Sequence, residues 1–150
     1  MPAAVPPLRV LLVDDDPAFA ELITCLLRMD GVEVLAHAFD GAEGVELALD
    51  LRPDVVVMDV RMPRMDGLEA TRRILGSLAD TAVLVVSSSK DPEDVQRALD
   101  AGAAGYLPKD RATAELLERL EQLRPLRSSP EARAVPYRVW EWKAIQAATG

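Results

Sequence analysis

Five short apolar runs recur along the chain, about 22 to 28 residues apart. The third and fourth runs contain VVVM and AVLVV without alternating polar residues, which is typical of parallel strands covered by helices on both faces. Segments with apolar residues at helical spacing lie between the runs. Strands that alternate with helices predict right-handed βαβ units and a doubly wound α/β fold. The expected strands are Leu8–Val13, Val32–Ala36, Asp54–Asp59, Ala82–Ser87 and Ala104–Leu107.

The first helical segment opens with a capping signal, because Asp16 suits an N-cap and Pro17 suits the first helical position. Cys25 lies within the helical pattern, so we expect a buried and inert thiol there, and a single cysteine forms no internal disulfide. The expected strand order is 2-1-3-4-5, which puts a switch point between the first and third strands. Periodicity alone does not select this order from other open α/β arrangements. The apolar face of the first helix is expected to contain Phe19, Leu22, Ile23, Leu26 and Leu27.

The chain of 150 residues suggests one domain with short extensions. We expect an N-terminal tail over residues 1–7, a domain over residues 8–124, and a linker with an aromatic tail over residues 125–150. The last segment is rich in proline and serine before it reaches Tyr137, Trp140 and Trp142. Exposed aromatic residues are costly, so we expect these three to pack against the domain or across a homodimer.

The net charge of the chain limits the classes of partner that it is expected to bind. The formal net charge is −8, and residues 125–150 carry four basic and two acidic groups, so the rest of the chain is still more acidic. An acidic body repels nucleic acid, which argues against direct DNA contact. No apolar run approaches the length of a membrane span, and the N-terminus has no secretory signal pattern. We therefore expect a cytoplasmic location.

Polar residues gather where the expected strands end. Asp14, Asp15 and Asp16 follow the first strand, Asp59 ends the third, Ser87 ends the fourth and Lys109 follows the fifth. Each alone has an ordinary explanation as a cap, a turn or a surface residue. In a doubly wound sheet, however, ligands bind at the carboxyl ends of the strands near the switch point.

Carboxylates that converge there repel one another, and burial penalises their charged forms. A Mg²⁺ ion relieves this repulsion, because it binds a few carboxylates and keeps positions open for phosphate oxygens. Lys109 and Ser87 would then stabilise a phosphoryl group, while the carboxylate of Asp59 would accept it as an acyl phosphate.

Four segments resemble the response-regulator receiver domain in order and spacing: LLVDDDP at 11–17, VVVMDVRMPRMDG at 55–67, VVSSS at 85–89 and GYLPKD at 105–110. The resemblance covers about residues 8–124 and is closest to receivers that are usually fused to a helix-turn-helix output domain. It implies a flavodoxin-like (βα)5 fold with the strand order given above.

For the metal site, the resemblance implies that Asp59 is the phosphoacceptor and Asp15 a direct Mg²⁺ ligand. Asp14 would assist through water, and Arg61 would offer its backbone carbonyl to the metal.

For the switch, the resemblance implies that Ser87 is the mobile hydroxyl, Lys109 the phosphate-contacting lysine and Tyr106 the rotating aromatic. A second interpretation of Tyr106, a half-buried aromatic that seals a strand edge, is compatible with the first. Phosphorylation would change the surface of the fourth helix, fifth strand and fifth helix. One departure is that Asp110 follows Lys109, where many receivers have proline.

The resemblance also implies partners: a sensor histidine kinase or phosphotransfer protein as donor, and a downstream protein or an output domain as target. Residues 125–150 are too few for a helix-turn-helix domain of that class, so we expect either a stand-alone receiver or a receiver fragment of a transcriptional regulator. Catalysis would be limited to Mg²⁺-dependent self-phosphorylation and autodephosphorylation.

Two alternatives remain. The first is a docking module that works without phosphorylation, although such a module has no need of the complete set of site residues. The second is an enzyme on a related sheet, such as a flavin-binding oxidoreductase or an aspartate-dependent phosphatase. A Gly-rich phosphate cradle is missing after the first strand, and Arg61 stands where such a phosphatase would have a second aspartate. His37 is expected in a solvent-facing loop.

Overall fold

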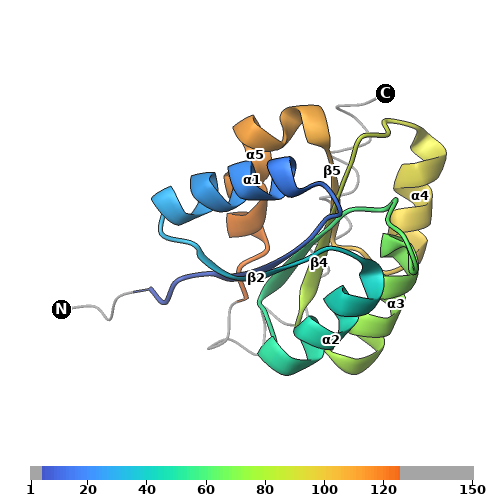
Figure 1. Cartoon of the computed structure of the whole chain (residues 1–150), viewed down its shortest axis with the longest axis horizontal. Helices are drawn as coiled ribbons and strands as arrows, with labels where there is room; N and C mark the ends of the chain where they lie inside the picture. The colour runs from blue at the N-terminus through green and yellow to red at the C-terminus, as the bar shows by residue number, and fades with distance from the viewer. Residues whose placement is uncertain (1–4, 126–150) are drawn as a thin grey trace.

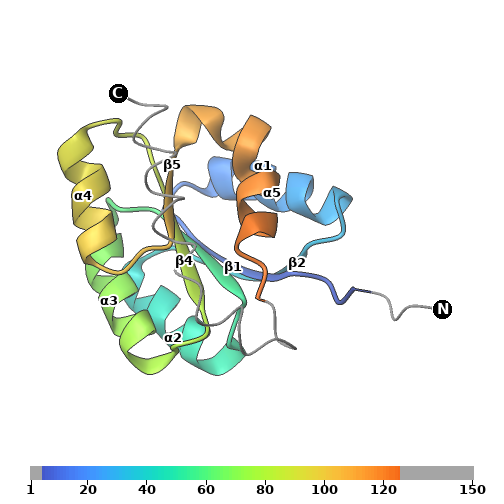
Figure 2. The ribbon, with the colours of Figure 1, turned by 180° about the vertical axis from the view of Figure 1, so that it is seen from behind.

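The computed structural model describes residues 5–125, which form a five-stranded parallel sheet with the order β2-β1-β3-β4-β5. Helices α1 and α5 lie on one face, and α2, α3 and α4 lie on the other (Figures 1 and 2). The predicted doubly wound fold and strand order are confirmed. The strands are β1 (Arg9–Val13), β2 (Glu33–Ala38), β3 (Val55–Met58), β4 (Ala82–Ser87) and β5 (Gly105–Pro108). The helices are α1 (Pro17–Met29), α2 (Gly41–Leu51), α3 (Gly67–Ser77), α4 (Pro92–Asp100) and α5 (Ala112–Gln122), with a short 3₁₀ helix at Lys109–Arg111.

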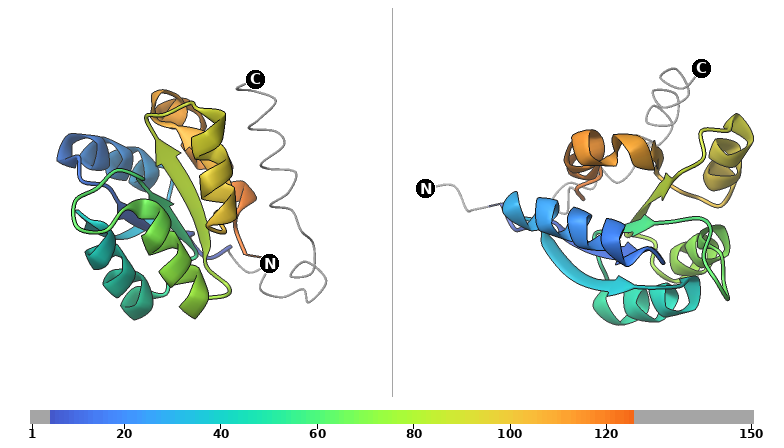
Figure 3. Two further views of the ribbon diagram at one scale, coloured as in Figure 1. Left: turned by 90° about the vertical axis from the view of Figure 1, so that its right-hand side faces the viewer. Right: turned by 45° about the horizontal axis from the view of Figure 1, so that its top comes forward.

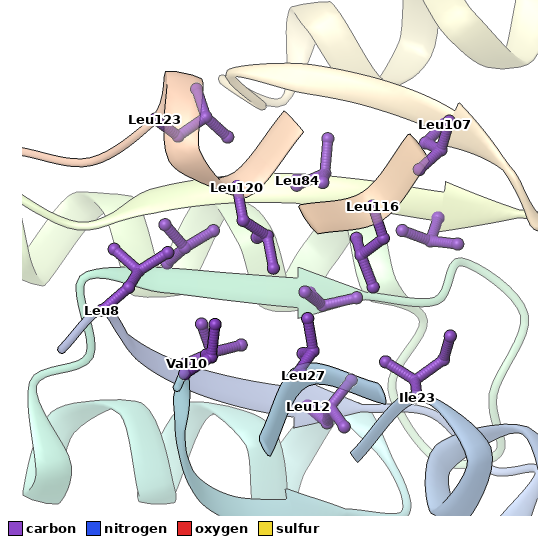
Figure 4. Close-up of a cluster of buried hydrophobic side chains, with 14 of the residues drawn as sticks. Leu8, Val10, Leu12, Ile23, Leu27, Leu84, Leu107, Leu116, Leu120 and Leu123 are labelled. Atoms are coloured by element: carbon purple, nitrogen blue, oxygen red, sulfur yellow. The ribbon is translucent and has the colours of Figure 1, made fainter. Parts of the chain in front are cut away.

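The two helical layers explain why the strands lack alternation. Every residue of β3 and β4 is buried, because side chains on both faces of the sheet meet helices. The apolar residues divide into one cluster beneath α1 and α5 and another beneath α2, α3 and α4. Figure 4 shows the first cluster, in which Leu116 and Leu120 of α5 face Leu27 of α1 above the sheet.

Four helices begin at the carboxyl edge of the sheet with an aspartate N-cap. Asp16 accepts hydrogen bonds from the backbone N–H groups of Ala18 and Phe19 at 3.1 and 3.3 Å, so its predicted capping role is confirmed. Asp40, Asp66 and Asp91 cap α2, α3 and α4 in the same way. This satisfies backbone donors and places negative charge at the positive end of each helix dipole.

The second strand extends further than predicted. Its end is fixed by pairing with β1, where the backbone N–H of Asp14 donates to the carbonyl of Ala38 at 3.0 Å. His37 therefore belongs to β2 and is partly buried, so its assignment to a solvent-facing loop is wrong. β4 has the predicted bounds, and the remaining strand boundaries differ from the predicted ones by at most one residue.

The buried face of α1 is narrower than predicted. Its buried residues are Ala20, Ile23 and Leu27, whereas Leu22 is 48% exposed and Cys25 is also exposed. The predictions of a buried Leu22 and a buried Cys25 are therefore wrong. Successive helical residues are about 100° apart, so Cys25 points almost opposite to both Ile23 and Leu27.

The predicted packing of Tyr137, Trp140 and Trp142 lies outside the described residues. Within residues 5–125, every helix is too short or too polar to cross a membrane.

Both views in Figure 3 show α1 and α5 together over one face of the sheet, opposite α2 and α3.

A pair of leucine substitutions on α1 tests this packing. Leu27 is 2% exposed and belongs to the core cluster, so Leu27→Ala should lower the unfolding free energy by about 2–5 kcal/mol through lost burial and a cavity. Leu22→Ala removes the same atoms from a half-exposed position and should change the unfolding free energy by less than about 0.5 kcal/mol. Urea denaturation of both variants measures the difference, and equal losses would contradict the observed orientation of α1.

Candidate functional site

The carboxyl edge of the sheet brings the predicted acidic residues together. Asp14 and Asp15 follow β1, and Asp59 follows β3. These strands are neighbours, with Val13 paired to Met58, and the backbone N–H of Asp59 donates to the carbonyl of Val13 at 2.9 Å. One carboxylate oxygen from each of the three aspartates lies within 4.8 Å of the others. The predicted convergence of these carboxylates is confirmed.

Two of the three carboxylates are buried. Asp14 is 3% and Asp59 is 7% exposed, whereas Asp15 is exposed. Asp14 accepts a hydrogen bond from the backbone N–H of Asp16 at 2.8 Å, and Asp59 accepts one from that of Val60 at 2.8 Å. These neutral donors leave most of the negative charge uncompensated. Three close oxygen ligands with one side open to solvent fit a hard divalent cation such as Mg²⁺.

Lys109 extends from the end of β5 to the same carboxylates. Its Nζ lies 2.9 Å from Asp14 Oδ2 and 3.4 Å from Asp59 Oδ2. Burial alone would lower the pKa of Lys109, but the hydrogen bond to Asp14 and the charge of Asp59 raise it above its usual value. The ammonium is therefore charged and offsets part of the charge of the cluster.

The pKa of Asp59 is raised to about 6, chiefly by burial and then by the charge of Asp14. Lys109 and the backbone N–H of Val60 favour the ionised form but do not restore the ordinary value. The carboxyl group of Asp59 therefore titrates just below neutral pH, and a cation in the cluster would favour its ionised form.

Ser87 and Tyr106 lie on the next two strands of the sheet. Ser87 ends β4 and is buried, and its Oγ accepts a hydrogen bond from the backbone N–H of Ser89 at 3.2 Å. Tyr106 of β5 is 0% exposed, and its hydroxyl donates to the carbonyl of Ser89 at 2.6 Å. The ring is thus fully buried, and the expectation of a half-buried ring is wrong. Burial raises the pKa of Tyr106, so the hydroxyl remains a hydrogen-bond donor.

The loop after β3 is shaped by close contacts that its sequence did not reveal. A Cβ added to Gly67 would lie 1.8 Å from the carbonyl oxygen of Asp59, so only glycine allows the loop to return this closely. Arg64 adopts the left-handed backbone region, with φ of 69°, and forms an ion pair with the buried carboxylate of Asp40. The side chain of Arg61 is exposed. The metal contact predicted for Arg61 involves only its backbone carbonyl.

Two further contacts involve residues that sequence patterns assigned to other roles. His37 Nε2 lies 2.7 Å from the carbonyl oxygen of Asp14. The ring of Phe19, expected only as a core residue, lies beneath Lys109, whose Nζ is 4.7 Å from the ring centroid. Phe19 follows the acidic run within one helical turn. This closeness in the sequence is the feature from which a contact between Phe19 and the site could have been predicted.

A parallel sheet of this order, with acidic residues at the switch point and lysine and serine at neighbouring strand ends, defines a class of phosphate-handling signalling domain. The family described as "Response regulator receiver domain" matches residues 10–121. The chain belongs to this family, and the predicted resemblance is confirmed. It is a receiver domain of the kind found in response regulators of two-component systems.

Among relatives, the response regulator MprA of Mycobacterium sp. (strain KMS) is 42% identical over 125 residues, which cover 83% of this chain and 54% of MprA. The protein-glutamate methylesterase/protein-glutamine glutaminase 5 of Geobacter metallireducens is 44% identical over 128 residues, covering 81% of this chain and 36% of that protein. The chain thus spans about half or less of the length of these curated relatives. The solved signal receiver domain of the response regulator NarL from Mycobacterium tuberculosis is 36% identical with a TM-score of 0.74, covering 77% of this chain and 94% of that one.

The raised pKa of Asp59 predicts an unusual dependence of stability on pH in metal-free protein. The folded state holds the proton more tightly than the unfolded chain, so the stability present below about pH 4 is lost as pH rises to about 6. Urea unfolding in EDTA should show this fall.

The Asp59→Asn variant supplies the control. Its amide does not ionise, so the difference in unfolding free energy between variant and wild type should grow in favour of the variant between pH 4 and 6. A difference that stays constant across this range would show that Asp59 is not destabilised by ionisation.

Proposed function

We propose that this receiver domain accepts a phosphoryl group on Asp59 from a histidine kinase or a phosphotransfer protein, in a reaction that depends on Mg²⁺. The supporting observation is the buried carboxylate of Asp59, which lies beside Asp14 and in contact with the ammonium of Lys109. A carboxylate held in this way is a nucleophile for phosphorus.

In the proposed reaction, one carboxylate oxygen of Asp59 forms a bond to phosphorus. The bond between phosphorus and the histidine nitrogen of the donor breaks, and its electron pair leaves with that nitrogen. Lys109 offsets charge on the phosphoryl oxygens and Ser87 donates a hydrogen bond to one of them. Positioning and electrostatic stabilisation of this kind supply most of the catalysis in phosphoryl transfer. The chemistry of the domain is confined to its own phosphorylation and dephosphorylation.

Mg²⁺ would be held by Asp15 and Asp59 directly, by Asp14 through water, and by the backbone carbonyl of Arg61. When bound there, the ion neutralises charge on the phosphoryl oxygens. The three clustered carboxylates support this assignment, because one ammonium offsets only part of their charge.

The proposed switch runs through the loop between β4 and α4. Phosphorylation draws the hydroxyl of Ser87 toward the phosphoryl group, away from its bond to the backbone N–H of Ser89. The carbonyl of Ser89 accepts the hydroxyl of Tyr106, and the hydroxyl of Ser89 donates to Asp94 in the first turn of α4. A shift at Ser87 is therefore passed to both β5 and α4.

We propose that the surface made by α4, β5 and α5 then gains or loses affinity for a downstream protein or an output domain. The acidic body of the chain supports a protein partner rather than direct contact with nucleic acid.

Acetyl phosphate supplies a direct test, because it replaces the kinase as phosphoryl donor. The 150-residue chain incubated with acetyl phosphate and Mg²⁺ should gain the mass of one phosphoryl group, and Asp59→Asn should gain none. Asp80→Asn changes an exposed aspartate and is the matched control. Intact-mass spectrometry measures all three proteins. An unmodified wild type at saturating donor would favour the docking module that works without phosphorylation.

A second prediction concerns the metal. Mg²⁺ that binds only the folded state should raise the melting temperature, and the rise should continue with the logarithm of the Mg²⁺ concentration once this exceeds the dissociation constant. Asp15→Asn should weaken Mg²⁺ binding by roughly tenfold or more, because it removes a charged ligand. Asp16→Asn alters the adjacent residue, but asparagine also serves as an N-cap, so binding should stay within about twofold of wild type. Calorimetric titration compares them, and equal losses would contradict the ligand assignment.

A further inference from the structure

We infer that Phe19 is a positioning residue for Lys109, holding the lysine ammonium over the acidic crevice through the face of its ring. The inference rests on the proposed function of Lys109. The Nζ of Lys109 lies 4.7 Å from the centroid of the Phe19 ring, within the range of about 6 Å in which the ring quadrupole attracts a cation.

The Phe19 ring is itself held in place. Phe19 stands in the first turn of α1, where its backbone N–H donates to the Asp16 cap. Its side chain is partly buried against the core cluster between the sheet and the α1–α5 layer, the cluster drawn in Figure 4. One part of the ring therefore packs on the core, while its face meets the ammonium.

The other contacts of Lys109 are less durable. Its Nζ is bonded to Asp14 at 2.9 Å and to Asp59 at 3.4 Å, and these carboxylates belong to the cluster that fits a divalent cation. A metal ion would compete with Lys109 for the same carboxylates, and phosphorylation would convert Asp59 to an acyl phosphate. The ring of Phe19 is unaltered by either event.

A lysine side chain has high rotamer entropy and a strongly hydrated end group. Without a lasting contact, Lys109 would spend more time in solvent once the metal occupies its carboxylate partners. The contact with Phe19 keeps the ammonium near the point where the phosphoryl group arrives. Phe19 acts through Lys109 and does not itself touch the reacting atoms.

The first experiment uses Phe19→Leu in the 150-residue chain, because leucine preserves apolar packing and removes the ring. The initial rate of phosphorylation by acetyl phosphate at saturating Mg²⁺ should fall roughly two- to tenfold, the range given by a contact of this type. The affinity for Mg²⁺ should stay within about twofold of wild type, because no metal ligand is changed. Phe39→Leu is the matched control, since Phe39 is the only other phenylalanine and packs against His37.

A fluorination series separates the cation contact from packing. Fluorine atoms weaken the negative potential of the ring face and change its shape little. In a Phe39→Leu background, 4-fluorophenylalanine and 3,4,5-trifluorophenylalanine enter position 19 alone. The phosphorylation rate should fall with each degree of fluorination. Equal rates across the series would overturn the inference and leave Phe19 as a packing residue.

A measurement without phosphorylation keeps the inference distinct from the proposed function. An aromatic face shifts nearby protons upfield, so the ε-methylene protons of Lys109 should resonate upfield in wild type, both with and without Mg²⁺. They should move to the ordinary lysine position in Phe19→Leu, with Lys109→Arg providing the assignment. Unshifted protons in wild type would refute the contact, whereas shifted protons in a protein that acetyl phosphate does not modify would refute only the proposed function.

Discussion

The pairing of β1 with β3 places Asp14 and Asp59 side by side in a crevice where burial strengthens their repulsion. Neighbouring groups in the site offset part of this repulsion. Lys109 reaches both carboxylates from β5, backbone N–H groups donate to each of them, and the pKa of Asp59 still remains high. A domain built only for stability would gain by replacing such a cluster with apolar residues. The proposed phosphoryl and metal chemistry, which needs concentrated negative charge, would account for this cluster at the carboxyl edge of the sheet.

The loops around the cluster are correspondingly constrained. Gly67 allows the loop after β3 to return to the carbonyl of Asp59, and Arg64 ties the same loop to the buried carboxylate of Asp40. Arg64 takes a left-handed backbone conformation, which is unfavourable for a residue with a side chain. Strain of this kind is tolerated where surrounding contacts fix the backbone. These contacts hold the loop that carries Asp59 and Arg61 against the start of α2.

Two aromatic residues connect the site to the rest of the domain. The hydroxyl of Tyr106 donates a hydrogen bond to the loop that follows Ser87, so the buried ring is linked to that loop. Phe19 joins the core to Lys109 from the opposite face of the sheet. Both rings satisfy the apolar pattern of their elements, and both also contact a polar group at the functional edge.

The sequence by itself determined the fold class and the carboxylates at the site, and its resemblance to a known family supported the strand order. Continuous apolar strands, aspartate N-caps and the order of polar residues at strand ends are local features, and local features are legible in a sequence. The run of three aspartates also separated as predicted, with Asp16 as a cap and Asp14 and Asp15 in the cluster.

Only the tertiary structure decided the orientation of α1, the place of His37 and the second role of Phe19. Helical periodicity allowed a wide apolar face, but the sheet and α5 cover only the stripe through Ile23 and Leu27, which leaves Cys25 in solvent. His37 joined β2 because β1 offered it a backbone partner. The contact between Phe19 and Lys109 joins residues 90 positions apart in the chain. Such contacts depend on which elements pack together, and a one-dimensional pattern does not encode their distances.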